Sequence, residues 1–264
     1  MGGKSSQERA RTRDFREKLF RRRLLRWFRR HGRDLPWRRT RDPYQVLVSE
    51  FMLQQTQVSR VREYYPRFLE AFPSLHALAL AQPRQVREQW DGLGYYRRAE
   101  NLHRLARRVV DHHDGSIPSD LVRLRSLPGV GPYTAGAVLS FAFEQPVAAV
   151  DTNVARVIRR AFYPRSPQGK ASRRIWETTQ RLVPRNGKRA WTFNQAVMEL
   201  GALICTARAA HCGVCPVRAA CATGGRAPGS NGQSSRQVRM IRALEGPPAC
   251  PPARLPASAE LIKR

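Results

Sequence analysis

Four of the five cysteines in this chain fall within one short segment, and this clustering constrains the fold more than any other feature. The four are Cys205, Cys212, Cys215 and Cys221. A secreted disulfide scaffold spreads its cysteines through a small chain, whereas a local group in a longer chain is typical of metal ligation. The spacing fits either zinc or an iron–sulfur cluster and does not distinguish them. His211 would be a surplus fifth ligand, so we interpret it as a loop residue, and Cys250 lies apart.

The second constraint is charge. The 264 residues contain 48 Lys and Arg against 20 Asp and Glu, which gives a net charge of +28. Such a field attracts a phosphate backbone, so nucleic acid is the expected partner. The apolar run at 135–143 is too short to cross a bilayer, and no apolar segment follows the basic N-terminus as in a secretion signal. We therefore expect a soluble intracellular protein, cytoplasmic and nucleoid-associated in a prokaryote.

The apolar pattern predicts an all-α fold. Between about residues 43 and 222 apolar residues recur at three- and four-residue spacing, and no run alternates as a strand would. Residues 1–30 are rich in arginine and predict a frayed arm followed by a basic amphipathic helix over 21–30. Residues 223–264 are rich in Gly, Pro, Ser and Arg, so we expect an unfolded tail there. The domain between them is residues 31–222.

The segment Leu127-Pro-Gly-Val-Gly-Pro-Tyr-Thr134 predicts a tight turn between two helices. A helix ending at Leu127 and a new helix starting at Pro132 would leave unpaired backbone N–H groups directed at one point. Gly129 and Gly131 would let a ligand approach the backbone closely. An ordinary helix–helix turn uses the same residues, but the net charge favours a phosphate clamp that is independent of base sequence.

Two carboxyl groups lie in unusual surroundings. Glu50 stands among apolar residues on a predicted helix, and Asp151 follows the apolar segment 146–150 and precedes another predicted helix. Glu50 could equally be a paired structural carboxylate, and Asp151 could be an ordinary helix cap. One protonated and one ionised carboxyl group are also what cleavage of a glycosidic bond through an oxocarbenium-like transition state requires.

These motifs occur together, in the same order, in one family. Over residues 35–221 the chain resembles the adenine DNA glycosylases of the MutY family, within the helix-hairpin-helix DNA glycosylase superfamily. The matching segments are Leu35-Pro-Trp-Arg38, Ser49-Glu50, Met52-Leu-Gln-Gln-Thr56, Gly92-Leu-Gly-Tyr-Tyr96, Leu127 to Thr134, Val150-Asp151, Asn153-Val154, Phe193-Asn-Gln195, Glu199-Leu-Gly-Ala202 and the four cysteines. The resemblance implies an all-α, two-lobed fold, with a six-helix barrel lobe, a lobe that carries a 4Fe-4S cluster, and duplex DNA between them.

The resemblance also implies catalytic roles. Glu50 would protonate adenine at N7 and then help to activate water. Asp151 would stabilise the positive sugar, with Asn153 supporting it. Tyr133 occupies the position that holds a Schiff-base lysine in strand-cutting relatives of the endonuclease III type, so the resemblance implies a monofunctional N-glycosylase without strong strand cleavage.

Further positions correspond to the DNA interface, because a base must leave the duplex before its glycosidic carbon is accessible. The pocket for the extruded adenine corresponds to Trp37, Arg38, Leu53, Val58 and Gln195, and the residues that fill or wedge the base stack correspond to Gln55 and Tyr95. The hairpin residues Leu127, Gly129, Val130, Gly131 and Thr134 would bind the DNA backbone. Core packing explains Trp37, Leu53 and Val58 nearly as well.

The chain departs from the family in one respect. Family members usually continue into a Nudix-like domain that recognises 8-oxoguanine, whereas only residues 222–264 follow the last clustered cysteine. We expect this domain to be lacking, which leaves guanine and 8-oxoguanine open as the opposing base. A sister group that removes thymine or uracil opposite guanine shares the cysteines, the aspartate and a hairpin tyrosine, but the paired glutamines Gln54 and Gln55 favour adenine.

A non-catalytic DNA-binding module with a metal cluster is the alternative from a different class. A binding module would have no reason to keep both Glu50 and Asp151 in these settings. We expect an enzyme that acts as a monomer on duplex DNA containing a mismatched or damaged base pair.

Overall fold

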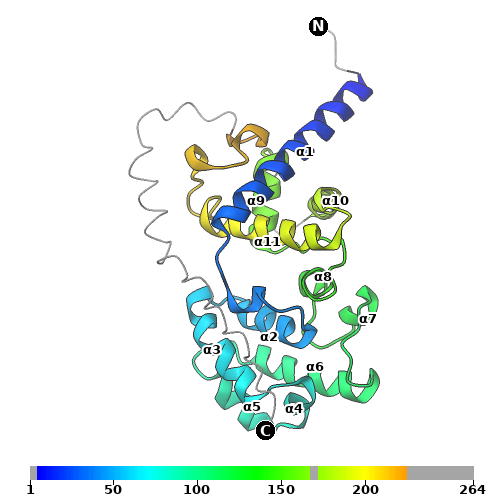
Figure 1. Cartoon of the computed structure of the whole chain (residues 1–264), viewed down its shortest axis with the longest axis vertical. Helices are drawn as coiled ribbons and strands as arrows, with labels where there is room; N and C mark the ends of the chain where they lie inside the picture. Colours follow the sequence, from blue (N-terminus) through cyan, green and yellow to red (C-terminus); the bar gives the residue numbers. More distant parts are fainter. Residues whose placement is uncertain (1–4, 167–171, 225–264) are drawn as a thin grey trace, which may run out of the picture. The chain divides into compact units, whose positions relative to one another are not determined.

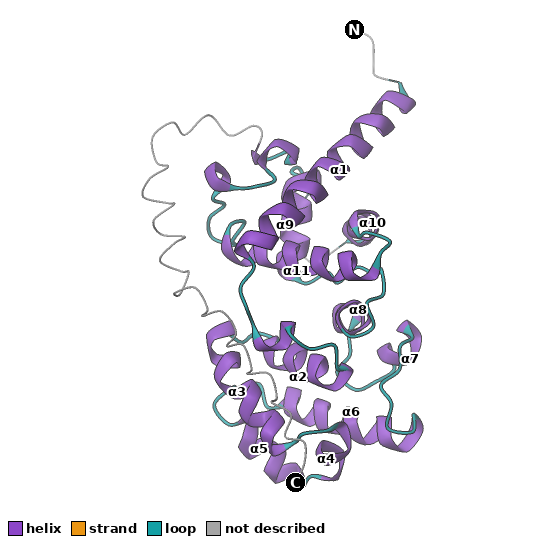
Figure 2. Cartoon of the chain, in the orientation of Figure 1, coloured by secondary structure: helices purple, strands orange, loops and turns teal. Residues whose placement is uncertain are grey.

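The computed structural model of the chain describes residues 5–166 and 172–224, and within these ranges all regular elements are helices (Figures 1 and 2). The elements are α1 Ser6–His31, η1 Pro36–Arg38, α2 Pro43–Leu53, α3 Val58–Ala71, α4 Leu75–Leu80, α5 Pro83–Trp90, α6 Arg97–His112, α7 Leu121–Arg125, α8 Pro132–Phe141, α9 Thr152–Phe162, α10 Arg173–Leu182, α11 Gly187–Leu203, η2 Cys212–Val214 and η3 Arg218–Ala220. The expected all-α fold is confirmed. No helix of this described part is long and apolar enough to span a bilayer.

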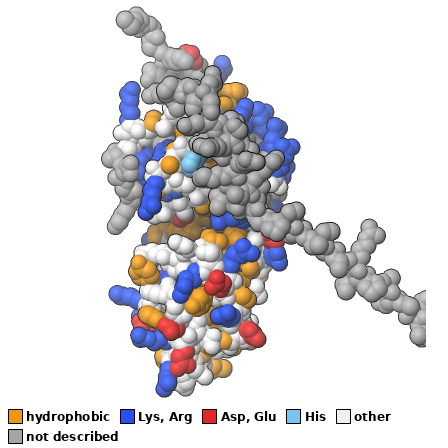
Figure 3. Space-filling view, turned by 90° about the vertical axis from the view of Figure 1, so that its left-hand side faces the viewer, with side chains coloured by type: hydrophobic (Ala, Val, Ile, Leu, Met, Phe, Trp, Pro, Cys, Tyr) orange, Lys and Arg blue, Asp and Glu red, His pale blue; other side chains and the backbone are white. Residues whose placement is uncertain are grey.

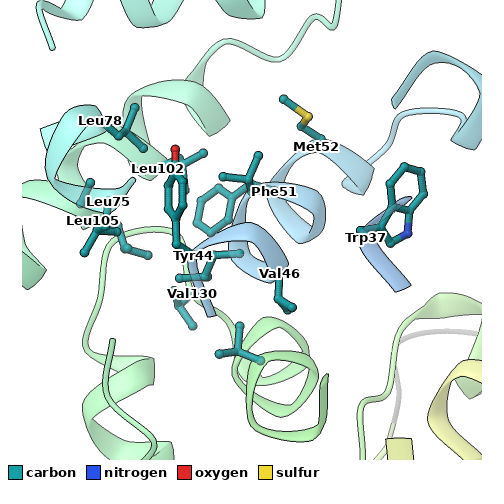
Figure 4. Close-up of a cluster of buried hydrophobic side chains, with 14 of the residues drawn as sticks. Trp37, Tyr44, Val46, Phe51, Met52, Leu75, Leu78, Leu102, Leu105 and Val130 are labelled. Carbon is teal, nitrogen blue, oxygen red and sulfur yellow. The ribbon is translucent and has the colours of Figure 1, made fainter. Parts of the chain in front are cut away.

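The helices α2 and α8 are apolar on almost every side and lie at the centre. Both begin with proline, which suits the first helical position, and Asp42 caps α2 by accepting a hydrogen bond from the Gln45 N–H at 3.0 Å. Figure 4 shows Val46, Phe51 and Met52 pointing from different sides of α2. A helix that is hydrophobic all round is a buried helix. A carboxyl group on such a helix is therefore held inside the protein.

The buried side chains form two hydrophobic cores. The first core is built from η1 and helices α2 to α8, and the second from α1, α9, α10 and α11 with the segment that carries the cysteines. In Figure 1 the helices of the first core lie in the lower half and those of the second in the upper half. Trp191 and Met198 on α11 contact both cores. This division corresponds to the two lobes that were expected.

The expected hairpin is present between α7 and α8. The first helix ends at Arg125, two residues before the expected end, because the Ser126 N–H bonds to both the Val122 and Arg123 carbonyls and tightens the last turn. Gly129 has a φ of +75°, and a Cβ there would lie 2.9 Å from the Phe51 ring. This turn position therefore requires glycine.

The N-terminal helix is longer than expected. Helix α1 begins at Ser6, capped by the Ser5 hydroxyl, so most of the segment expected to fray is helical. Phe20, Leu24 and Phe28 recur every four residues and are buried in the second core. The expected tail at 223–264 and Cys250 lie almost wholly outside the described residues.

Candidate active site

Glu50 lies on the central helix α2 with only 4% of its surface exposed. Its Oε2 accepts a hydrogen bond from the Tyr133 hydroxyl at 2.6 Å. Burial is the main cause that raises the pKa of Glu50 to about 7, and the nearby Asp151 carboxylate acts in the same direction, while the Tyr133 hydrogen bond and the Arg38 charge oppose the rise. Glu50 can therefore carry a proton near neutral pH and give it up.

Asp151 caps helix α9 and also faces the same site. Its Oδ1 accepts from the Val154 N–H at 2.6 Å and its Oδ2 from the Asn153 amide at 2.9 Å. Burial raises its pKa above the ordinary value, and these hydrogen bonds partly oppose that effect. Asp151 can therefore cap α9 and also act in the site, because its carboxylate lies within electrostatic range of Glu50 and Tyr133.

Tyr133 is hydrogen-bonded to Glu50 and lies within electrostatic range of Asp151. It is the second residue of α8, and burial together with the charges of Glu50 and Asp151 raises the pKa of its phenol well above the ordinary value. The phenol therefore stays neutral and acts as a hydrogen-bond donor. Helix α8 approaches the segment before Asp151 closely, since a Cβ at Gly136 would lie 2.4 Å from the Ala148 carbonyl oxygen. The structure thus brings Glu50, Tyr133 and Asp151 together from three helices.

A polar network lies beside this group. The Arg38 guanidinium donates to Gln195 Oε1, to the Arg33 carbonyl and to Glu199 Oε2, each at 2.8 Å. Glu199 is 1% exposed, and its two carboxylate oxygens also accept from Nε and Nη2 of Arg33. Burial alone would raise the pKa of Glu199, but the two arginines hold it below its ordinary value. Glu199 is therefore a buried anion that fixes Arg38.

Glu199 lies within a motif that matches the family, but the motif by itself predicted no role for it. A signal was available, because Glu199 follows Gln195 by four residues on α11 and so shares its face of the helix. The four-residue spacing could therefore have predicted that Gln195 and Glu199 bind the same partner, which is Arg38.

The remaining pocket residues differ in burial. Trp37 is 7% exposed and packs edge-on against Tyr65, with ring centroids 5.6 Å apart, so it is a member of the first core. Leu53 and Val58 are half-buried at the end of α2 and the start of α3, and they pack on the rim of that core. Leu53 and Val58 therefore keep surface with which to contact a ligand, whereas core packing accounts for Trp37.

Gln55 and Tyr95 lie on two exposed loops. Both are in the left-handed region, with φ of 58° and 50°, and Tyr95 is 62% exposed. Gln55 also lines a polar pocket of about 340 Å³, together with Thr56, Gln57, Ser59, Arg60, Glu63 and Leu93. Gln55 and Tyr95 thus present an amide and an aromatic side chain to solvent, each from a loop of the first lobe.

At the hairpin, backbone groups are more accessible to a ligand than side chains are. Leu127, Val130 and Thr134 are buried, while Gly129 is exposed and Gly131 is half-buried. Gly131 is the N-cap of α8, and no side chain caps that helix. Any contact with a phosphate at this turn would be made by backbone N–H groups.

The four clustered cysteines are free thiols that line one pocket between α9, the end of α11 and the 205–224 segment. Arg160 Nη1 lies 3.4 Å from Cys205 Sγ, and the Gly224 N–H donates to Cys221 Sγ at 3.3 Å. Within residues 5–166 and 172–224, no three His, Cys, Asp or Glu side chains are grouped closely enough to hold a single metal ion. The donor set of four thiols around one pocket, with N–H groups directed at sulfur, fits a thiolate-bound metal group.

This arrangement defines a class: helix-hairpin-helix proteins that hold a buried pair of carboxyl groups beside a hairpin tyrosine. The family model for HhH-GPD superfamily base excision DNA repair proteins matches residues 48–181. The chain belongs to this superfamily, so the resemblance drawn from the motifs is confirmed at that level.

Curated relatives point to one subgroup. The chain is 46% identical over 195 residues to the adenine DNA glycosylase of Mycolicibacterium smegmatis, covering 74% of this chain and 66% of that protein. It is 44% identical over 213 residues to the adenine DNA glycosylase of Homo sapiens, covering 76% of this chain and 39% of that protein. The chain thus spans less than two thirds of the length of these relatives.

Solved structures agree on the fold. A thermostable thymine-DNA glycosylase matches with a TM-score of 0.75 and 31% identity, covering 81% of this chain and 99% of that one. A trapped endonuclease III–DNA covalent intermediate matches with a TM-score of 0.68 and 24% identity, covering 81% and 97%. The second likeness shows the fold alone.

Proposed function

We propose that this chain is the catalytic part of a monofunctional adenine DNA glycosylase, which hydrolyses the bond between a mispaired adenine and its deoxyribose. The observation that carries the proposal is the buried Glu50, with a pKa of about 7, hydrogen-bonded to Tyr133 and within the field of Asp151. A buried carboxyl group poised near neutral pH beside a second carboxylate suits acid-catalysed cleavage of a glycosidic bond. The adenine DNA glycosylases among the relatives support adenine as the base.

In this mechanism the adenine leaves the stack and protonated Glu50 transfers its proton to N7. The bond between the base and the sugar carbon then breaks with its electron pair going to the base. Asp151 stabilises the positive charge left on the sugar, and Asn153 holds that carboxylate through its amide. The Glu50 carboxylate finally accepts a proton from the attacking water, which regenerates the acid.

Tyr133 sets the outcome after the base has left. It supplies a hydrogen bond to Glu50 and has no amine, so no Schiff base with the sugar can form at this position. We propose that the product is an intact strand with an abasic site, and that cleavage of this strand needs added alkali.

Binding of the duplex is assigned to three features of the described chain. Backbone N–H groups at the Gly131 end of the hairpin would hold a phosphate, and Gln55 and Tyr95 would enter the stack. Arginines exposed on α1 would add affinity without base selectivity, because phosphates carry no sequence information. Figure 3 shows Lys and Arg side chains on the described part of this face, with Asp and Glu side chains among them in the lower half. We propose that one copy of the chain binds one duplex, inside the cell.

We further propose that Cys205, Cys212, Cys215 and Cys221 hold a 4Fe-4S cluster. Bound there, the cluster would fasten the 205–221 segment against α9, and it would supply a redox-active group. The Arg160 guanidinium and the Gly224 N–H lie where they would stabilise thiolate ligands. A brown protein with a broad visible absorption band supports this proposal, and a colourless protein that contains zinc contradicts it.

A second candidate, removal of thymine or uracil opposite guanine, is favoured by the likeness to the thymine-DNA glycosylase. The two are separated by a panel of duplexes that carry A, T or U opposite G or 8-oxoguanine, each treated with alkali after incubation. We expect abasic sites only in duplexes that contain mispaired A, and the panel also identifies the preferred opposing base. Release of T or U without release of A would contradict the proposed function.

A further inference from the structure

Arg98, at the start of α6, is a buried cation held by neutral groups. It is 7% exposed, and no carboxylate pairs with it in the part of the chain that the structure describes. One arm of the guanidinium donates to the carbonyls of Phe51 (3.0 Å), Met52 (2.7 Å) and Gln54, and the other donates to the Thr56 hydroxyl (3.0 Å) and the carbonyls of Leu93 (3.1 Å) and Gly94 (3.0 Å). A buried charge is costly unless its N–H groups are hydrogen-bonded, and these contacts satisfy both amino groups of Arg98, while its buried Nε has no partner among the described residues.

The two arms of Arg98 reach two separate segments. The carbonyls of Phe51 and Met52 belong to the last turn of α2, where a helix lacks internal partners and carries partial negative charge. The carbonyls of Leu93 and Gly94 belong to the loop between α5 and α6. The planar fork of arginine, with donors on both arms, matches this double attachment.

Each of these segments presents one exposed residue in a strained conformation. The Gln54 carbonyl directly precedes Gln55, with φ 58°, and the Gly94 carbonyl directly precedes Tyr95, with φ 50°. Such conformations persist in non-glycine residues only when the surroundings enforce them. The Arg98 guanidinium also lies 5.5 Å from the centroid of the Tyr95 ring.

We propose that Arg98 is a positioning residue that joins the loops 54–57 and 92–95 into one unit, so that Gln55 and Tyr95 enter the DNA stack together. This proposal rests on the proposed function and deepens it. None of the contacts of Arg98 involves the side chain of Glu50, Tyr133 or Asp151. Arg98 should therefore matter for opening a base pair and not for hydrolysis of a base that is already unpaired.

The test compares two substrates under single-turnover conditions: a duplex with adenine opposite 8-oxoguanine, and a duplex with the same adenine in an unpaired bulge. The variants are Arg98→Met and Arg98→Lys, and the matched control is Arg104→Met, which removes an exposed arginine from the same helix. Lysine keeps the charge but lacks the fork, so it should not restore the double attachment.

We expect both Arg98 variants to lose on the order of 10²-fold in adenine release from the paired substrate, and to keep the parental rate on the bulge. 2-Aminopurine beside the target adenine should show a smaller rise in fluorescence on binding. Equal loss on both substrates, or no loss on the paired one, would overturn the proposal. If Arg98→Met does not fold, Arg98→Lys alone carries the test.

Hydrogen exchange in the free protein separates this proposal from the proposed function. The amides of 54–57 and 92–95 should exchange faster in both Arg98 variants and as in the parental protein in Arg104→Met. Unchanged exchange in Arg98→Lys would overturn the link between the loops, whatever the enzyme does. A parental protein that releases no adenine from either substrate would instead overturn the proposed function, with the exchange result still deciding the link.

Discussion

A carboxyl group is costly to bury, and Glu50 is buried on a helix whose other buried members are almost all apolar. Its surroundings act in two directions, since the apolar walls favour the protonated acid while the Tyr133 hydroxyl favours the carboxylate. Burial raises the pKa of Asp151 as well, but Asp151 receives more hydrogen bonds than Glu50, and these favour its ionised form. The pair is therefore arranged so that one carboxyl group holds a proton while the other can hold a charge.

The unusual settings of Glu50 and Asp151 could be predicted from the sequence, but the residues alone predicted neither their proximity nor the role of Arg98. Glu50 and Asp151 were singled out because each is a polar residue in an apolar segment. Their proximity was implied only by the family resemblance, because it depends on how α2, α8 and α9 pack. Arg98 gave no signal, since it is one of many arginines and its contacts with the Phe51, Met52 and Gln54 carbonyls join residues far apart in sequence.

Adenine release should depend on pH through Glu50. The active form is the protonated acid, so the single-turnover rate should fall as pH rises through about 7, the pKa of Glu50. Tyr133→Phe removes a hydrogen bond that favours the carboxylate, so the pKa should rise and the fall in rate should move to higher pH. A rate independent of pH from 6 to about 9 in the parental protein would contradict the assignment of the acid.

The same pKa predicts how stability varies with pH. Because the pKa of Glu50 is about 7 in the folded protein and 4.5 without the fold, the folded state binds more protons between these values. The free energy of unfolding should therefore fall as pH rises from 4.5 to about 7, with Glu50 contributing ~3 kcal/mol at most. Urea unfolding of Glu50→Gln should show a smaller fall than the parental protein, and an identical fall in both would show that Glu50 is not the titrating group.

At the scale of elements, the helices were predictable because apolar residues recur at helical spacing and because proline and glycine mark the ends. The hairpin was found for this reason, within two residues at the end of α7. The start of α1 was predicted wrongly. Its stability depends on the Ser5 cap and on contacts far away in sequence, such as the Arg16 guanidinium to the Ala220 carbonyl at 2.7 Å, and local sequence does not reveal these contacts.

Two glycines of the hairpin should separate stability from DNA affinity. Gly129→Ala places a side chain at φ +75° against Phe51, so it should lower the free energy of unfolding by about 1 to 3 kcal/mol. Gly131→Ala meets no atom within 4 Å and has an ordinary φ of −89°, so it should leave stability unchanged. If the backbone there holds a phosphate, Gly131→Ala should weaken duplex binding. Unchanged affinity in Gly131→Ala would count against the phosphate site.

For the whole molecule, the dominant quantity is the net charge of +28. Composition alone predicted a polyanion as partner, but it could not say where the charge lies. The structure puts many arginines of α1 on the surface while Phe20, Leu24 and Phe28 bind the same helix to the second core. Helix α1 is therefore packed against the second core. The arginine-rich composition had predicted a separate N-terminal arm because it does not reveal this packing.

The salt dependence of binding should reflect this charge. The logarithm of the affinity for duplex DNA should fall linearly with the logarithm of salt concentration, at about −0.9 per phosphate neutralised. Replacing the exposed Arg22, Arg23 and Arg26 with glutamine should reduce the slope and weaken binding equally for mispaired and fully paired duplexes. A nearly flat dependence in the parental protein would argue against nucleic acid as the main partner.

The central claim is that Glu50 gives its proton to a mispaired adenine, and the direct measurement is single-turnover release of free adenine by the parental protein and by Glu50→Gln at neutral pH. Duplex affinity is measured in parallel and should be the same for both proteins. If Glu50 is the general acid, the parental protein should release adenine and Glu50→Gln should be slower by about 10² to 10⁴. Release of adenine by Glu50→Gln at the parental rate would contradict this role of Glu50.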